Sequence, residues 1–252
     1  ILGKNFSDGR GNVTGYFSYE DTSAVTQSER DYSACSLSGY FDDNSISCGG
    51  SSTLPEGRFT DFGTFAGDED EGIPDQSFDY IVAGDQFVQR EGELFNFAPS
   101  NYFLRPNERI TAGLMAHFDF SEYLTAYAEV GYMNNQTVAQ IAPSGNFFST
   151  DTLSCGNPLL SDQQFQVLCD DFDLTEDDEQ TVFIGKRNVE GGFRADDLEH
   201  EQTRVVLGLR GSLNSNWSFD TFVNYGEVQY RETYDNDLSI TKIARALDVV
   251  SD

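Results

Sequence analysis

The chain has 252 residues and carries 43 Asp and Glu against 15 Lys and Arg, a formal net charge of -28 at pH 7. This charge argues against nucleic-acid binding and against attraction to anionic headgroups, because no basic patch in the sequence offsets it. Gly, Tyr and Phe are frequent, and no long helical periodicity appears, so the composition predicts an all-β chain. No run of about 18 apolar residues occurs, which argues against a transmembrane helix.

The first predicted element is a hairpin over residues 1–25. The stretch "ILGKNF" is followed by the turn "SDGRGN", in which Asp-Gly and Gly-Asn are strong turn signals. After the turn, Val13, Gly15, Phe17 and Tyr19 alternate with polar residues and Tyr16. A period of two indicates a strand with one apolar and one polar face.

The second hairpin is predicted over residues 107–135. In its first strand the even-numbered positions from 110 to 120 are apolar, whereas Arg109 and His117 belong to the odd-numbered positions. After a short turn, the second strand repeats the alternation and places Glu129 on the polar face. The two strands therefore have matching apolar faces.

The third hairpin is predicted over residues 202–232. Its first strand alternates apolar residues with Arg204 and Arg210, and after a turn at 214–216 the alternation resumes, with Phe222 as an exception on the polar face. Four strands of the chain sustain the alternation for about ten residues or more, whereas soluble strands average about five or six. A tilted strand needs about 9 to 11 residues to span a bilayer.

Long polar segments separate the hairpins, over residues 26–106 and 136–201, and a further one begins at 233–252. Compact soluble domains rarely contain connections longer than about 15 residues. In a transmembrane barrel, short turns lie at one rim and long loops at the other. In such a barrel, the short connections of this chain would be periplasmic turns and the long ones would be extracellular loops.

The four cysteines lie in these polar segments as two local pairs, Cys35 with Cys48 and Cys155 with Cys169. Each pair would close a ring of about 15 residues, a constraint worth about 3 kcal/mol in the chain-entropy estimate. Four cysteines allow three connectivities, and disulfides within the local pairs are favoured over free thiols. Disulfides indicate an oxidising space outside the cytosol.

Two architectures share a period of two: a soluble β-sandwich, and a barrel whose apolar face meets lipid. Every Arg of the predicted long strands, namely Arg109, Arg204 and Arg210, lies on the polar face. An Arg on the lipid-facing side costs about 2 to 4 kcal/mol near the bilayer midplane. The sequence therefore predicts an antiparallel transmembrane β-barrel fragment of about six strands, which cannot close alone and is expected to belong to a larger barrel.

Five stretches point to one family: 95–133 ("FNFAPSNYFLRP…"), 138–148 ("VAQIAPSGNFF"), 185–200 ("GKRNVEGGFRADDLEH"), 203–228 and 243–250 ("IARALDVV"). In combination they resemble TonB-dependent outer-membrane receptors of Gram-negative bacteria. The resemblance implies a plugged barrel of about 22 strands in the cell outer membrane. Such a receptor binds a scarce nutrient outside the cell and imports it with energy supplied through TonB.

The same resemblance implies three partners: outer-membrane lipid, TonB together with the plug domain of the full-length protein, and an unidentified small-molecule or oligomeric nutrient. It implies no cofactor. The plug domain and the last barrel strands do not appear in these 252 residues, so the chain is expected to be a middle part of the barrel that does not transport alone.

Two sets of side chains are candidate sites. The polar-face residues are expected to line the lumen, where solvation and cross-strand pairing are favoured over contact with plug or ligand; they are Arg109, His117, Glu129, Arg204 and Arg210. An acidic stretch could bind Ca²⁺ or a cationic substrate, and it contains Asp170, Asp171, Asp173, Glu176, Asp177, Asp178 and Glu179. It lacks the ligand order of an EF-hand loop, so a solvated loop is favoured and no metal site is predicted.

The stretch "RNVEGG" (187–192) has two interpretations, a turn that orders the second long segment or a ligand contact. No nucleophile elbow, metal triad or phosphate-binding Gly loop appears, so no enzyme is expected. The alternative function is a soluble extracellular β-rich binding or adhesion module whose acidic loops bind Ca²⁺.

Overall fold

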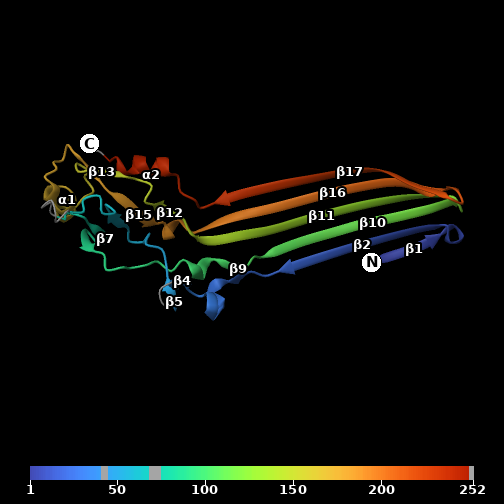
Figure 1. Ribbon diagram of the computed structural model, residues 1–252, viewed down its shortest axis with the longest axis horizontal. Coiled ribbons are helices and arrows are strands. Elements are labelled where there is room, and N and C mark those ends of the chain that lie inside the picture. Colours follow the sequence, from blue (N-terminus) through green and yellow to red (C-terminus); the bar gives the residue numbers. More distant parts are fainter. Residues whose placement is uncertain (41–44, 68–74, 250–252) are drawn as a thin grey trace. The chain divides into compact units, whose positions relative to one another are not determined.

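The computed structural model describes residues 1–40, 45–67 and 75–249. The chain divides into two compact units, shown in Figure 1, which are treated separately below. The long-strand unit comprises residues 1–25, 102–139 and 196–234, and the loop unit comprises 26–101, 140–195 and 235–252. The described residues are mostly strand, as the composition predicts.

The long-strand unit is one six-stranded sheet in the order β1-β2-β10-β11-β16-β17. Its strands are β1 (Leu2–Phe6), β2 (Gly11–Thr22), β10 (Asn107–Ser121), β11 (Leu124–Pro143), β16 (Phe193–Asn214) and β17 (Trp217–Asp235). β1 pairs antiparallel with β2, and β10 pairs antiparallel with both β2 and β11. The antiparallel fold is confirmed; in the described residues the sheet is open, with β1 and β17 at its edges.

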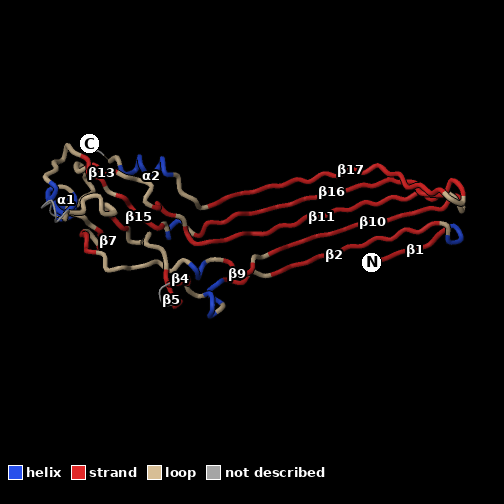
Figure 2. The backbone as a smooth tube through the Cα atoms, in the orientation of Figure 1, coloured by secondary structure: helices blue, strands red, loops and turns tan. Residues whose placement is uncertain are grey.

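The strands are long, as Figure 2 shows, and short turns join β1 to β2, β10 to β11 and β16 to β17. β11 has 20 residues and extends to Pro143, and β16 has 22 residues and begins at Phe193. The sequence pattern places the corresponding hairpin limits at 135 and 202. The additional residues are strand without apolar alternation.

The register puts the predicted apolar positions of the sheet on one face. Leu114 lies opposite Gly15 on β2 and Val130 on β11, and Ala112 lies opposite Phe17 in the same manner. Leu114 is 48% exposed and Met115, its neighbour on the other face, is 46% exposed. Both faces of the sheet are therefore open along β10.

The apolar face has an end. Beyond it the same face carries Asn134, whose amide donates to Glu199 at 3.1 Å, and Gln136, whose amide donates to Asp197 at 3.2 Å. Arg231 also binds Glu199, at 2.8 Å. The far parts of β11, β16 and β17 are thus polar on the face that is apolar nearer the turns.

Two glycines on the polar face make room for aromatic rings of neighbouring strands. The ring of Tyr16 lies where a Cβ of Gly113 would be, and the ring of Tyr127 lies where a Cβ of Gly208 would be. A larger residue at either glycine would displace the ring. These contacts favour one register between β2 and β10 and between β11 and β16.

The loop unit contains a five-stranded sheet in the order β12-β15-β6-β7-β8. Its strands are β6 (Arg58–Thr60), β7 (Asp79–Ala83), β8 (Gln86–Gln89), β12 (Gly145–Phe147) and β15 (Phe183–Arg187). Two-stranded sheets pair β4 (Ser36–Tyr40) with β5 (Ser45–Gly49) and β13 (Thr152–Ser154) with β14 (Glu179–Thr181). A further two-stranded sheet pairs β3 (Val25–Thr26) with β9 (Tyr102–Leu104).

Two short helices complete the loop unit, α1 (Asp162–Leu168) and α2 (Ile240–Leu247). α1 begins at a capping box, in which the Ser161 hydroxyl accepts from the Gln164 amide and the Gln164 side chain accepts from the Ser161 amide. No helix of the described residues is long and apolar enough to cross a membrane.

The loop unit has its own hydrophobic core. Its buried members are Phe78, Phe87, Leu153, Cys155, Leu168, Cys169, Val182 and Ile184. Both predicted disulfides are confirmed, Cys35–Cys48 and Cys155–Cys169, and the second lies inside this core. The segments expected as long loops therefore contain a folded unit, which their polar composition did not predict.

Candidate functional site

The first candidate site is the polar face of the six-stranded sheet, where the predicted lumen residues form cross-strand pairs. The Arg109 guanidinium donates to Asn135 on β11 at 2.8 Å. On β16, Arg204 donates to Asn224 at 2.9 Å and lies 3.9 Å from the Glu129 carboxylate. The side chains of this ion pair are 53% and 47% exposed, so the pair contributes little stability in water.

A second group of polar-face side chains surrounds Tyr127. Its hydroxyl donates to Asp220 at 2.7 Å, and the Arg210 guanidinium lies 5.6 Å from its ring centroid. His117 pairs in register with Asn12 on β2 and with Tyr127 on β11. These side chains line a hollow of about 310 Å³, which offers donors, acceptors and both signs of charge.

The structure thus brings all five predicted lumen residues to one face and adds Tyr127, Asp220 and Asn224 as their partners. Sequence reasoning did not single out these three residues. Their pairing depends on the register of strands β11, β16 and β17, which the alternation alone does not give.

The acidic stretch follows α1 and ends at Glu179, the first residue of β14, and all seven of its candidate residues are exposed. Asp170 opens a 3₁₀ turn, and Asp173 ends it with a left-handed backbone at φ 58°. No group of three or more His, Cys, Asp or Glu side chains among the described residues is placed to hold a metal ion. The arrangement is that of a solvated acidic turn.

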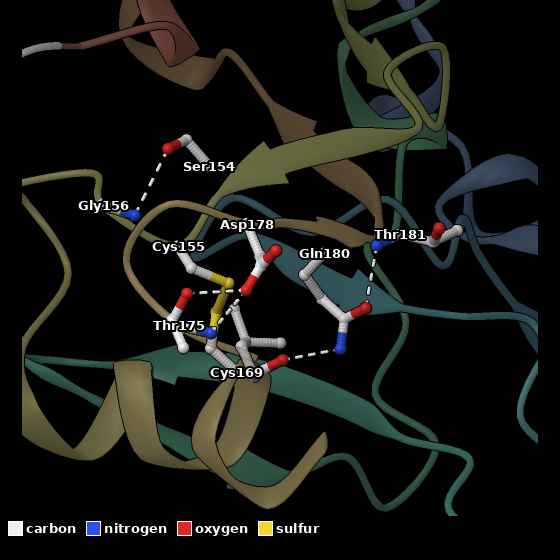
Figure 3. Close-up of a disulfide and its surroundings, with 9 residues drawn as sticks. Ser154, Cys155, Gly156, Cys169, Thr175, Asp178, Gln180 and Thr181 are labelled. Atoms are coloured by element: carbon white, nitrogen blue, oxygen red, sulfur yellow. Dashed lines mark hydrogen bonds between the residues drawn. A yellow bond between two sulfur atoms is a disulfide. The ribbon is translucent and has the colours of Figure 1, made fainter. Parts of the chain in front are cut away.

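Asp178 has a local structural role, drawn in Figure 3. Its carboxylate accepts from the Thr175 amide at 2.8 Å and from the Thr175 hydroxyl at 2.7 Å. These hydrogen bonds stabilise the charged form and hold the pKa of Asp178 below its ordinary value. Asp178 therefore fixes the turn that precedes β14.

The same view shows how the Cys155–Cys169 disulfide is tied to β14. The side chain of Gln180 donates to the Leu168 carbonyl at 2.6 Å and accepts from the Thr181 amide at 2.8 Å. Gln180 is buried, so both bonds satisfy polar atoms away from water. Together with the disulfide, they join the end of α1 to β14.

The second candidate site is built from Arg–Phe contacts that sequence analysis did not single out. Arg58 lies 5.4 Å from the ring centroids of both Phe62 and Phe148, and its guanidinium binds Asp79 through two bonds of 2.6 and 2.7 Å. Arg90 reaches the same carboxylate at 3.4 Å. The charge of Arg58 is thus balanced by a neighbouring side chain.

Arg187 occupies a similar aromatic setting. It is 3% exposed, lies 5.0 Å from the Phe95 ring and 4.9 Å from the Phe147 ring, and donates to the Pro143 carbonyl at 3.0 Å. Arg194 lies 5.8 Å from the same Phe147 ring and donates to the Ala142 carbonyl at 3.1 Å. The two guanidiniums therefore contact the same aromatic ring, and each donates to one of two consecutive carbonyl groups.

Phe95, Phe147 and Arg187 come from three of the stretches that carry the family resemblance. The sequence analysis therefore contained these stretches, but only the fold shows that the three residues lie together. The stretch 187–192 forms a turn, in which the Asn188 amide donates to the Ser144 carbonyl at 2.8 Å and Gly192 has a φ of 84°. The turn interpretation agrees with this geometry, and ligand contact stays a prediction.

Comparisons with protein families, with curated proteins and with solved structures find no match to this chain. The class that the fold itself defines is a mostly β, disulfide-containing chain with an open antiparallel sheet of long strands and a smaller folded unit.

Proposed function

We propose that this chain is part of an outer-membrane active-transport receptor of the TonB-dependent type, which binds a scarce nutrient outside the cell and imports it. The observation that carries the proposal is the exposed apolar face of the six-stranded sheet. The chemistry is recognition and gating, in which no bond is made or broken.

The apolar face is too extensive to suit water. Leu114 on β10, Leu207 on β16 and Val223 on β17 point away from the polar face, and Val223 is 76% exposed. Soluble monomers rarely expose contiguous apolar patches larger than a few hundred Å². A lipid environment would cover these side chains at no cost in hydration.

The size of the apolar face suits a bilayer. On β10 it extends from Ile110 to Phe120, ten residue steps, which correspond to about 33 Å along the strand. At a tilt of about 40° this length spans about 25 Å, the height of the apolar band on outer-membrane barrels. At this end Asn134 pairs with Ile110, and the polar groups of Asn134, Glu199 and Arg231 require water.

Aromatic residues lie near both ends of this face, as in the girdles of membrane barrels. Phe120, Tyr123 and Trp217 are exposed beside the short turns. Tyr19 and Tyr132 are exposed at the other end. Tyr and Trp favour the interface between apolar and aqueous phases because each has an apolar ring and a polar atom.

The open edges of the sheet also support a larger assembly. Unpaired backbone groups at β1 and β17 would be costly in lipid, so the proposal requires further strands from the rest of the protein to close the barrel. The polar face would then line the lumen and meet a plug domain. The short turns would face the periplasm, and the disulfide-linked loop unit would face the cell exterior.

Fractionation of the full-length protein in a Gram-negative host tests this proposal. We expect it in the outer-membrane fraction, extracted only by detergent, with a folded band on semi-native gels that shifts on boiling. Recovery from the periplasm or the medium without detergent would contradict the proposal and favour the soluble extracellular module.

A further inference from the structure

Two arginines of the loop unit have the same aromatic setting but different charge environments. Each lies about 5 Å from two phenylalanine rings, at distances within the range of a cation–π interaction. Arg58 has the bidentate carboxylate of Asp79 beside it. Arg187 has Arg194 instead, a second positive charge over the ring of Phe147.

Arg187 and Arg194 have no carboxylate partner among the described residues, since every ion pair within 4.0 Å involves other arginines or lysines. Two carboxylates of neighbouring segments have other partners: Glu190 binds Lys186 at 3.1 Å, and Asp237 accepts from the Ser144 hydroxyl. The Nε atom of Arg187 is buried without an acceptor in the described part of the chain.

Burying the guanidinium of Arg187 beside Arg194 costs free energy unless an anion balances the charge. A buried guanidinium without a countercharge loses its hydration, and a like charge nearby adds repulsion. Both effects lower the pKa of Arg187, burial first and the charge of Arg194 second. A purely structural role accounts for the stacking and for the bond to Pro143, but it does not account for two cations without an anion in a chain with 43 acidic residues.

We propose that Arg187, Arg194 and Phe147 form a binding site for an anionic group, a carboxylate or a phosphate. Arg194 is partly exposed and meets the anion directly, because a guanidinium presents paired donors that match two oxygens. Arg187, which is buried over the same Phe147 ring, supplies further positive charge. Phe147 is 42% exposed and offers a face to the rest of the bound molecule.

Identifying this anion as part of the imported nutrient rests on the proposed function, whereas anion binding itself does not. The net charge of -28 repels anions at long range. At physiological ionic strength such repulsion is screened within about 8 Å, so binding depends on contacts inside the site.

The test uses purified full-length protein in detergent, titrated calorimetrically with inorganic phosphate or with citrate at constant ionic strength set by chloride. We expect at least one of the two anions to bind, and Arg194→Gln to weaken that binding tenfold or more. Arg194→Lys keeps the charge but loses the paired donors, so its affinity for the anion is expected to lie between those of the wild type and Arg194→Gln. Arg30→Gln removes the same charge from an exposed position of the loop unit and is expected to bind as the wild type does.

The proposal is overturned if neither anion binds above the chloride background, or if Arg194→Gln binds as tightly as the wild type. Hydrogen exchange over residues 153–169 verifies that the variant retains the disulfide-linked core. Failure here is distinct from failure of the proposed function: a protein found in the outer membrane without anion binding loses only this inference. A soluble protein with Arg194-dependent binding loses only the transport proposal.

Discussion

The loop unit buries a cluster of large apolar side chains, whereas the apolar face of the long-strand unit leaves many of them exposed. Leu168 and Val182 are 0% exposed in the loop-unit core, while Leu213 and Val223 of the sheet are more than 70% exposed. The difference follows from how each unit is built. A sheet of alternating strands gathers apolar side chains on one face but does not cover them, and the loop unit surrounds its apolar side chains with short strands, a helix and a disulfide.

The comparison shows that the two units differ in how their apolar side chains are removed from water. The loop unit removes apolar area from water by itself, which is the usual driving force of folding. In the proposed function, lipid covers the apolar face of the long-strand unit. Substitutions in the loop unit should therefore lower its stability when they disturb its core. The effect of a substitution in the sheet should depend on which face carries the residue.

The largest effect is expected from Asp79→Asn in the loop unit. This change removes the countercharge of Arg58, whose side chain is 10% exposed, and leaves a buried guanidinium unpaired. Breaking such a pair costs about 3 to 5 kcal/mol. Urea unfolding followed by hydrogen exchange should show the loss in peptides around β6 and β7, with little change in β10.

Asp85→Asn is the matched control, because Asp85 is exposed in the turn between β7 and β8. It should change the free energy of unfolding by less than about 0.5 kcal/mol. If Asp79→Asn were equally mild, the buried Arg58–Asp79 pair would not be important for the loop unit.

The two disulfides provide the next test, since their sequence separations are 13 and 14 residues. Chain entropy gives each ring about 3 kcal/mol. Replacing Cys155 and Cys169 by serine should cost more than replacing Cys35 and Cys48, because the first pair is buried and its hydroxyls would lack partners. Chemical denaturation of the two double variants measures the difference, and the reverse order would contradict the assigned core.

Leu114→Arg and Met115→Arg test the two faces of the sheet directly. These neighbours on β10 are almost equally exposed and differ chiefly in the face they occupy. In a bilayer, Leu114→Arg should cost about 2 to 4 kcal/mol and Met115→Arg much less. The folded fraction of full-length protein in lipid vesicles at graded urea concentrations gives both values. Equal losses would mean that lipid does not cover the apolar face.

The smallest effect is expected at Asp178 on the exposed acidic turn. Its pKa is lowered in the folded state by hydrogen bonds from Thr175. Its contribution is therefore present above the unfolded-state pKa of about 3.9 and is lost as the pH falls through the lower folded value. Protection of the Thr175 amide, relative to its intrinsic exchange rate at each pH, should fall in the wild type as the pH drops through the lowered pKa of Asp178, and Asp178→Ala should show the weaker protection already at neutral pH. An unchanged amide in the variant would contradict this role.

The sequence predicted the apolar part of the sheet well because period-two alternation is a local signal. The positions around Leu114 and Val130 lie on one face as expected, and the local cysteine pairs form as expected. The alternation failed to predict how far the strands continue. Near Gln136 and Asp197 polar side chains occupy both faces, so the pattern disappears although the strand does not.

The core of the loop unit could not be predicted in the same way. Leu153, Leu168 and Val182 lie in short segments without a period, and pairings such as Phe183 with Thr60 join residues that are distant in the sequence. The surroundings of Arg187 show the same limit. Its partners Phe95 and Phe147 lie in separate stretches, neither of which shows a period-two alternation.

The most direct measurement of the central claim is an accessibility scan along β10 in full-length protein reconstituted into lipid vesicles. Single cysteines at Leu114, Met115, Ala116 and His117 would carry a spin label, since the native cysteines of the described residues are all in disulfides. The account predicts that labels at 114 and 116 collide with oxygen dissolved in the lipid, and that labels at 115 and 117 do so much less. Equal access of a water-soluble relaxation reagent to all four positions would contradict it.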